Sequence, residues 1–178
     1  MHGPESTLKR AALAAILIAA ALAPAEAQQR YGLGQPLSER ELAGWNIDVK
    51  PDGSGLPKGR GTAAIGAPLF AQQCAACHGA RGEGTLANKL AGGAGTLNTP
   101  AAQKTIGSYW PYATTLFDYI RRAMPHNAPQ SLKPDEVYAL TAYILQLNSV
   151  VEANTEINQA TLPKVEMPTR QGFKPVID

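Results

Sequence analysis

The sequence has little of what several protein classes require. It contains two cysteines, which allow one disulfide at most and exclude a disulfide-stapled scaffold. Only 17% of its 178 residues are charged and the formal net charge is +2, which excludes a nucleic-acid-binding protein that depends on a concentrated basic surface. Its longest apolar run, Ala11 to Ala23, has 13 residues. A membrane-spanning helix needs about 20.

That apolar run has the surroundings of a secretory signal peptide. Lys9 and Arg10 precede it, and Pro24 and the small-x-small triplet Ala25-Glu26-Ala27 follow. The alternative is an uncleaved membrane anchor, for which the run is short. We therefore expect residues 1–27 to be a signal peptide that is cleaved after about Ala27, which leaves a periplasmic protein without a transmembrane segment.

The segments at the two ends of the exported chain lack a regular pattern. Residues 28–61 show no sustained helical or strand period and are rich in glycine and proline. They are expected to form an extended arm, in which Trp45, Ile47 and Val49 alternate like a short strand that could attach the arm to the core. Residues 150–178 contain three prolines and are expected to form a tail without a long helix.

Helical spacing of apolar residues is confined to residues 62–149. Several prolines interrupt this region. Proline fits in the first turn of a helix but breaks a helix when it lies in the interior. The sequence therefore predicts an all-α domain with three main helices and a glycine-rich loop after the first. These helices are predicted from Ala63 to about Ala76, from Pro111 to about Ala123, and from Pro134 to about Asn148.

The first predicted helix ends on Cys74-Ala75-Ala76-Cys77-His78, the C-x-x-C-H attachment signature of c-type haem. Thiols three residues apart lie on one side of a helical turn and can form thioethers to the two haem vinyl groups. The adjacent histidine can then reach the iron as its proximal ligand. The motif predicts one covalently bound haem c, with its iron, on Cys74, Cys77 and His78.

Three other uses of the same cysteines fit the sequence less well. A zinc site needs four ligands, and the sequence has neither a second C-x-x-C nor a distant histidine pair. A thioredoxin-type dithiol is chemically feasible, but no strand–helix–strand pattern surrounds Cys74. A structural disulfide would leave His78 unexplained.

A second axial ligand decides whether the haem carries electrons or activates a substrate. Met124 lies just beyond the second predicted helix, before Pro125, where a loop can present its thioether to the iron. Met167 and His126 are the competing ligands. The alternative role for Met124 is that of a methionine that fills space in the hydrophobic core. With Met124 in the sixth position, the iron has no open site for a substrate, and the thioether raises its reduction potential.

Several further residues have more than one interpretation. Tyr109, Trp110 and Tyr112 either line the haem pocket and donate to its propionates or are core aromatics with polar tips. Arg121 and Arg122 either neutralise the propionates, face a partner, or form a solvated helix end.

Gly66 and Phe70, one turn apart on the first predicted helix, allow a close approach to the last helix, which offers Leu140 and Tyr143. Together with the C-x-x-C-H motif and Met124-Pro125, they make residues 62–149 resemble class I cytochrome c. The resemblance implies that fold: three main helices around one covalent haem, here with an extended N-terminal arm and a C-terminal tail.

A narrower resemblance covers most of residues 44–168. The stretches 45–57, 107–125 and 135–145 are similar to the cytochrome subunit of the Sox sulfane dehydrogenase, which accepts electrons from a molybdenum subunit. Members of that group commonly carry two haem domains, whereas this sequence has a single C-x-x-C-H. The resemblance thus implies a single-haem form of that subunit.

This resemblance implies a molybdenum-containing dehydrogenase subunit as the electron donor and another periplasmic cytochrome or an oxidase as the acceptor. Two alternatives stay open at this point. One is a general periplasmic shuttle to a terminal oxidase. The other is a haem enzyme that acts on a small substrate, which would need an open or labile sixth site.

Overall fold

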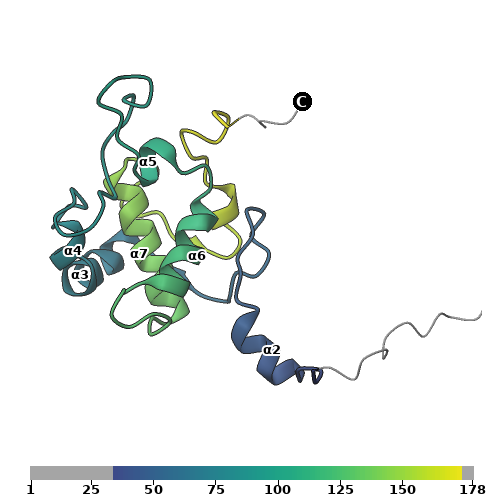
Figure 1. Ribbon diagram of the computed structural model, residues 1–178. Coiled ribbons are helices and arrows are strands. Elements are labelled where there is room, and N and C mark those ends of the chain that lie inside the picture. Colours follow the sequence, from purple (N-terminus) through teal and green to yellow (C-terminus); the bar gives the residue numbers. More distant parts are fainter. Residues whose placement is uncertain (1–33, 174–178) are drawn as a thin grey trace, which may run out of the picture. The chain divides into compact units, whose positions relative to one another are not determined.

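A computed structural model describes residues 34–173, so the predicted signal peptide and its cleavage site lie outside the described residues. The chain divides into two units, Met1–Glu41 and Leu42–Asp178. The second unit contains all of the elements discussed below except the start of the first helix (Figure 1). In chain order the elements are α2 (Glu39–Trp45), β1 (Arg60–Gly61), α3 (Ala63–Gln73), α4 (Ala75–His78), α5 (Ile106–Tyr109), α6 (Ala113–Ala123), α7 (Pro134–Leu147), β2 (Ile157–Asn158) and the 3-10 helix η1 (Leu162–Lys164).

Helices α3, α6 and α7 are the three main helices that the sequence predicts. Helix α7 begins at Pro134 as expected, and the Glu136 carboxylate accepts a hydrogen bond from the backbone N–H of Lys133, which satisfies a free donor at its start. Helix α6 begins at Ala113, two residues later than predicted, so Pro111 precedes it. The first predicted helix is divided at Cys74 into α3 and α4.

The closest helix crossing joins α3 to α7. A Cβ atom on Gly66 would overlap the carbonyl oxygen of Ala139, so only glycine permits this approach. One turn later, the rings of Phe70 and Tyr143 lie 5.2 Å apart. The predicted close packing of Gly66 and Phe70 against the last helix is therefore confirmed.

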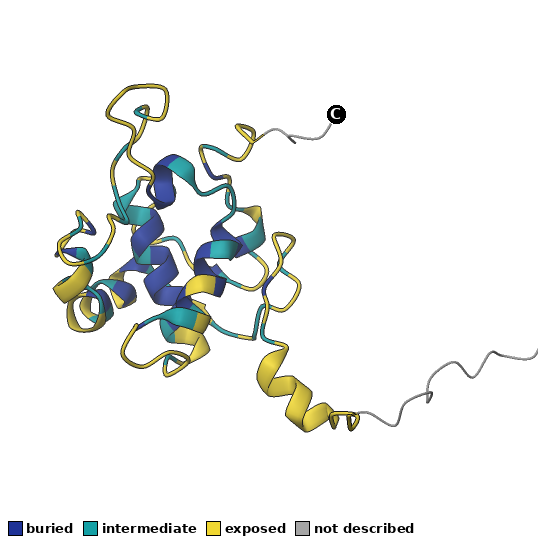
Figure 2. Cartoon of the chain, viewed as in Figure 1, coloured by how far each residue is buried: buried dark blue, intermediate teal, exposed yellow. Residues whose placement is uncertain are grey.

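The core is built around α7, with α6 on its other side (Figure 2). Leu116, Phe117 and Ile120 of α6 are buried, and the ring of Phe117 lies 4.4 Å from that of Tyr138 on α7. Because these residues recur every three or four positions, α6 has one buried face and one exposed face. The end of α6 therefore has a fixed position relative to α7.

The tail returns to the core instead of extending away from it. Its strand β2 pairs with β1 in an antiparallel arrangement, with Gly61 opposite Ile157. Ile157, Leu162 and Met167 are all buried in the main hydrophobic cluster. As predicted, the tail contains no long helix within the residues that the structure describes.

The arm differs from the sequence-based expectation because it contains the helix α2. Ser38 and Glu41 form reciprocal backbone-to-side-chain hydrogen bonds of 2.9 and 3.3 Å, a capping box that starts this helix. Trp45 at its end is 80% exposed and does not attach the arm to the core. Val49 does attach it, since this side chain is buried in the hydrophobic cluster.

Across residues 34–173, the structure contains no helix with the length and apolar character needed to cross a membrane.

Candidate haem site

The C-x-x-C-H motif folds as a single tight turn. The backbone N–H groups of Cys77 and His78 both donate to the carbonyl of Cys74, at 3.1 and 2.9 Å, while the N–H of Cys74 donates to Phe70 at the end of α3. Cys74 is partly buried against the core and Cys77 is exposed. Since the Phe70 ring packs against α7, the position of the motif depends on the crossing of α3 and α7.

The Cys74 thiol lies in an environment unlike that of a reactive dithiol cysteine. Burial, and to a smaller extent the neighbouring Cys77, raise the pKa of the Cys74 thiol to about 11. Reactive cysteines of dithiol enzymes have a lowered pKa, because the thiolate is the nucleophile. Burial of Cys74 therefore disfavours the thiolate that disulfide exchange requires.

The His78 imidazole is oriented by the loop that follows it. Its Nδ1 atom lies 2.9 Å from the backbone carbonyl oxygen of Asn88. A carbonyl accepts only from a protonated nitrogen, so this contact places the proton on Nδ1 and leaves the lone pair of Nε2 free for a metal. The same loop is fixed to the motif, since the Thr85 hydroxyl and the Ala87 N–H both donate to the Cys77 carbonyl at 2.8 Å.

Met124 lies at the end of α6, as the sequence predicts. It is the C-cap residue, and its N–H donates to the carbonyl of Ile120 at 3.1 Å. Its side chain is partly buried against the core. Of the two competing ligands, Met167 is only 3% exposed within the hydrophobic cluster, the setting of a packing residue, and His126 is exposed in the turn after Pro125.

The other candidate residues make contacts that the sequence does not reveal. Tyr109 packs against Phe173, with ring centroids 5.3 Å apart, and Trp110 packs edge-on against Tyr119 at 5.9 Å. The guanidinium of Arg170 lies over the ring of Tyr112. These aromatic residues are therefore tied to the tail and to α6.

Arg121 and Arg122 make specific contacts at the end of α6, and Arg122 is at the same time exposed. Arg121 donates to the backbone carbonyls of Ile47 and Gly55, and Arg122 pairs with Asp48 and Asp118. Both arginines thus hold the segment that precedes α3. The contacts of these arginines with Ile47, Asp48 and Gly55 join positions more than 60 residues apart, so a sequence without an alignment contains no signal for them. The pair of Arg122 with Asp118 is local, at the i,i+4 spacing of one helix.

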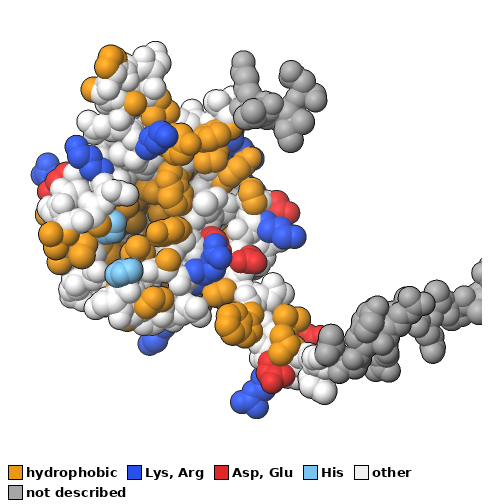
Figure 3. All heavy atoms as spheres, viewed as in Figure 1, with side chains coloured by type: hydrophobic (Ala, Val, Ile, Leu, Met, Phe, Trp, Pro, Cys, Tyr) orange, Lys and Arg blue, Asp and Glu red, His pale blue; other side chains and the backbone are white. Residues whose placement is uncertain are grey.

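The residues present fit a covalent haem. The motif supplies two thiols and an imidazole whose Nε2 is free, and Met124 adds a thioether. Apolar residues of the motif turn and the loops, and Met124 after α6, are only partly buried against the core. Figure 3 shows a face on which hydrophobic side chains gather beside histidine side chains. A largely apolar macrocycle needs such surroundings.

The helical fold and the C-x-x-C-H turn define a class I c-type cytochrome. The family model for cytochrome c matches residues 63–148, which hold the motif and helices α3 to α7. A solved structure extends the match: the sulfane dehydrogenase SoxCD from Paracoccus pantotrophus is 42% identical, with a TM-score of 0.79, and the alignment covers 83% of this chain and 73% of that chain. This chain therefore belongs to the cytochrome c family, carries covalently bound haem c with its iron, and acts as an electron carrier.

Proposed function

We propose that this chain is an exported single-haem cytochrome that accepts electrons from the molybdenum-containing subunit of a sulfur-compound dehydrogenase. It would pass them to another periplasmic cytochrome or an oxidase. The observation that carries the proposal is the extent of the likeness to sulfane dehydrogenase SoxCD. That likeness covers 83% of the chain, whereas the general cytochrome c match is limited to residues 63–148.

The haem in this proposal is held by four residues. Cys74 and Cys77 would form the thioethers, and Nε2 of His78 and the sulfur of Met124 would bind the iron. The bound haem supplies a one-electron redox couple. The Asn88 carbonyl supports this arrangement because it keeps the His78 ring in one tautomer and one orientation.

The ligation by Met124 favours a carrier over an enzyme. A six-coordinate iron offers no site to a small substrate, and constant ligation in both oxidation states limits reorganisation during electron transfer. Replacing Met124 by Ala tests this directly, because the ferric protein should lose the weak red charge-transfer band that reports a bond between methionine sulfur and iron. A band that persists would contradict the proposed ligation.

The proposed organisation of the chain is a signal peptide at 1–27, an arm at 28–61, the cytochrome domain at 62–149 and a tail at 150–178. The pairing of β1 with β2 supports a tail that wraps the domain. The Thr169 hydroxyl also donates to the Trp110 carbonyl at 3.2 Å. Arm and tail are thus additions that reach beyond the haem-binding helices.

Purification under mild conditions from the native periplasm tests the partner. We expect a second polypeptide and molybdenum to copurify with the haem, and a reduced sulfur compound to bleach the oxidised haem spectrum. The isolated chain is the matched control, because it should not be reduced by the same compound. A monomer without molybdenum would overturn the subunit assignment and favour a mobile shuttle to a terminal oxidase.

The intact mass of the same protein tests export. Cleavage after Ala27 leaves a chain that begins at Gln28 and carries the mass of one haem. An uncleaved chain that fractionates with membranes would contradict both the signal peptide and the periplasmic location.

A further inference from the structure

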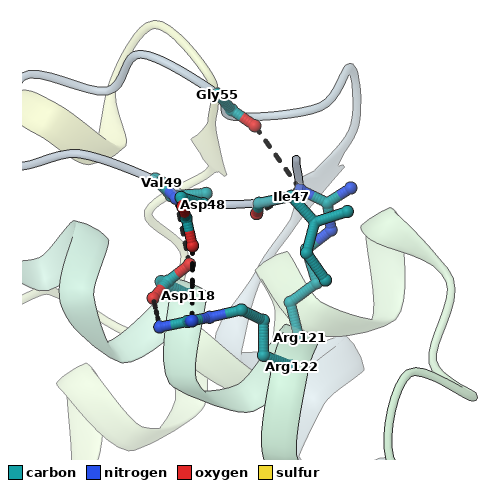
Figure 4. A network of polar contacts seen from close by, with 7 residues as sticks. All are labelled: Ile47, Asp48, Val49, Gly55, Asp118, Arg121 and Arg122. Carbon is teal, nitrogen blue, oxygen red and sulfur yellow. Dashed lines mark hydrogen bonds and ion pairs between the residues drawn. The ribbon is translucent and has the colours of Figure 1, made fainter. Parts of the chain in front are cut away.

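The segment of residues 47–55 is here called the strap (Figure 4). Residues 47–51 run antiparallel to α6, and residues 52–55 turn back so that Gly55 also meets Arg121. Moving up the helix, Thr114 donates to the Pro51 carbonyl at 3.4 Å and Asp118 accepts from the Val49 N–H at 2.9 Å. In the last turn of α6, Arg121 donates to the Ile47 carbonyl at 3.2 Å. The strap is therefore bonded to α6 from its first turn to its last.

Asp118 is the centre of this contact. Its side chain is only 10% exposed, which is unfavourable for a carboxylate unless both of its oxygens are paired. One oxygen accepts from the Val49 N–H, and the other is bound by the guanidinium of Arg122. Arg122 also pairs with Asp48 of the strap at 3.3 Å, so a single ion cluster joins helix and strap.

The strap also reaches the loop on the far side of Met124. Ile47 and Arg121 line a hollow of about 200 Å³ together with Gln130 and Leu132 of that loop. Within α6, the Met124 N–H is bonded to Ile120, the residue next to Arg121. The strap thus borders the helix turn before Met124 and the loop after it.

We propose that Asp118 and Arg121 are positioning residues for Met124. By binding the strap, they hold the end of α6 and the following loop in place and keep the thioether on the iron. This inference rests on the ligation of iron by Met124 proposed above. None of these side chains needs to touch the haem, since their effect passes through the backbone of α6.

The test measures how easily an external ligand displaces the thioether. Imidazole is titrated into the oxidised holoprotein, and the red band of the methionine–iron bond is followed. In Asp118→Ala, we expect the affinity for imidazole to rise about tenfold, because losing a buried charge-assisted hydrogen bond corresponds to about that factor. Arg121→Gln should raise the affinity less, since the bonds from Arg121 to the strap are longer.

The matched control is Ile157→Ala, which removes a buried side chain from β2, a strand that pairs with β1 and not with the strap. It should lower the denaturation midpoint and leave the imidazole affinity within about twofold of the unaltered protein. Equal increases in all three variants would show that only global stability matters and would overturn the inference. Unchanged affinity in both strap variants would also overturn it.

Two further variants keep the result interpretable. Asp118→Asn retains an acceptor for the Val49 N–H, so its imidazole affinity should lie between those of the unaltered protein and Asp118→Ala. It replaces the alanine variant in the test if that variant fails to mature. Met124→Ala separates the two proposals. If the band survives in Met124→Ala, the proposed ligation is wrong and so is the inference about the strap. If the band is lost in Met124→Ala but the strap variants keep the imidazole affinity of the unaltered protein, only the inference about the strap is wrong.

Discussion

Replacing Gly66 by Ala perturbs the helix crossing that positions the haem-attachment turn. The added Cβ would lie 2.6 Å from the carbonyl carbon of Ala139 and 2.8 Å from Cβ of Tyr143, and it would overlap the Ala139 oxygen. Carbon atoms in good contact are about 3.5–4.0 Å apart, so α3 and α7 must separate by roughly 1 Å. The obstacles are the backbone and a Cβ atom, which cannot rotate away.

Two opposing effects set the magnitude. Overpacking a core destabilises by about 1–3 kcal/mol, and the rigid neighbours of Gly66 place this case at the upper end. Alanine is favoured over glycine in a helix by about 1 kcal/mol. The net loss of unfolding free energy is therefore about 2 kcal/mol, which corresponds to a fall in Tm of roughly 6–8 °C for a domain of this size.

The assay is thermal unfolding followed by far-ultraviolet circular dichroism. The matched control is Gly44→Ala, because Gly44 is also in a helix, α2, but an added Cβ meets nothing within 4 Å. That control should leave the Tm unchanged or slightly raised, since only helix propensity acts there. Equal Tm values for Gly66→Ala and the unaltered protein would refute the close-crossing argument.

Three other predictions test the site and its surroundings. Met124→Ala should lower the midpoint potential measured by spectroelectrochemistry, because a thioether ligand raises that potential. Replacing the buried Met167 by Ala should instead reduce the free energy of unfolding by about 2–5 kcal/mol and leave the potential unchanged. The reverse pattern would make Met167 the ligand. Cys74→Ala combined with Cys77→Ala should give a chain whose intact mass lacks the haem, and a retained covalent haem would exclude thioether attachment at this motif. Burial raises the pKa of Tyr138 from 10.0 to about 12, although Arg121 acts in the opposite direction. The unfolded state therefore loses the phenol proton first, and stability due to this group falls as pH rises through that window. In urea unfolding, Tyr138→Phe should thus lose less unfolding free energy between neutral pH and about pH 11 than the unaltered protein does. An equal loss would show that the pH dependence does not come from Tyr138.

The features predicted from the sequence are those encoded by local spacing. The positions Cys74, Cys77 and His78 lie within one turn, so the motif specifies its own geometry. Helix α7 was predicted almost to the residue because Pro134 and the acidic residues after it mark its start. The break at Cys74 was not predicted, since nothing in the local sequence separates α3 from α4.

The prediction of a helix-free arm was wrong for a different reason. The signal for α2 was present, because Ser38 and Glu41 have the spacing of a capping box. It was outweighed by the surrounding glycine and proline residues. The Asn88 carbonyl could not have been predicted from the sequence, because any residue supplies a carbonyl and only the fold of the glycine-rich loop places this one beside His78.

The two sides of the proposed haem site differ in how the chain holds them. The cysteine and histidine side is local: one turn, supported by hydrogen bonds from the following ten residues. The methionine side depends on contacts across the whole chain, because α6 is held by the strap of residues 47–55 and the adjoining aromatic segment is held by Thr169, Arg170 and Phe173 of the tail. We therefore expect covalent attachment to depend on the turn and on the α3–α7 crossing that positions it, and the proposed methionine ligation to depend on the flanking segments as well. The proposed ligation thus predicts that residues outside the cytochrome match at 63–148 affect the redox properties of the protein.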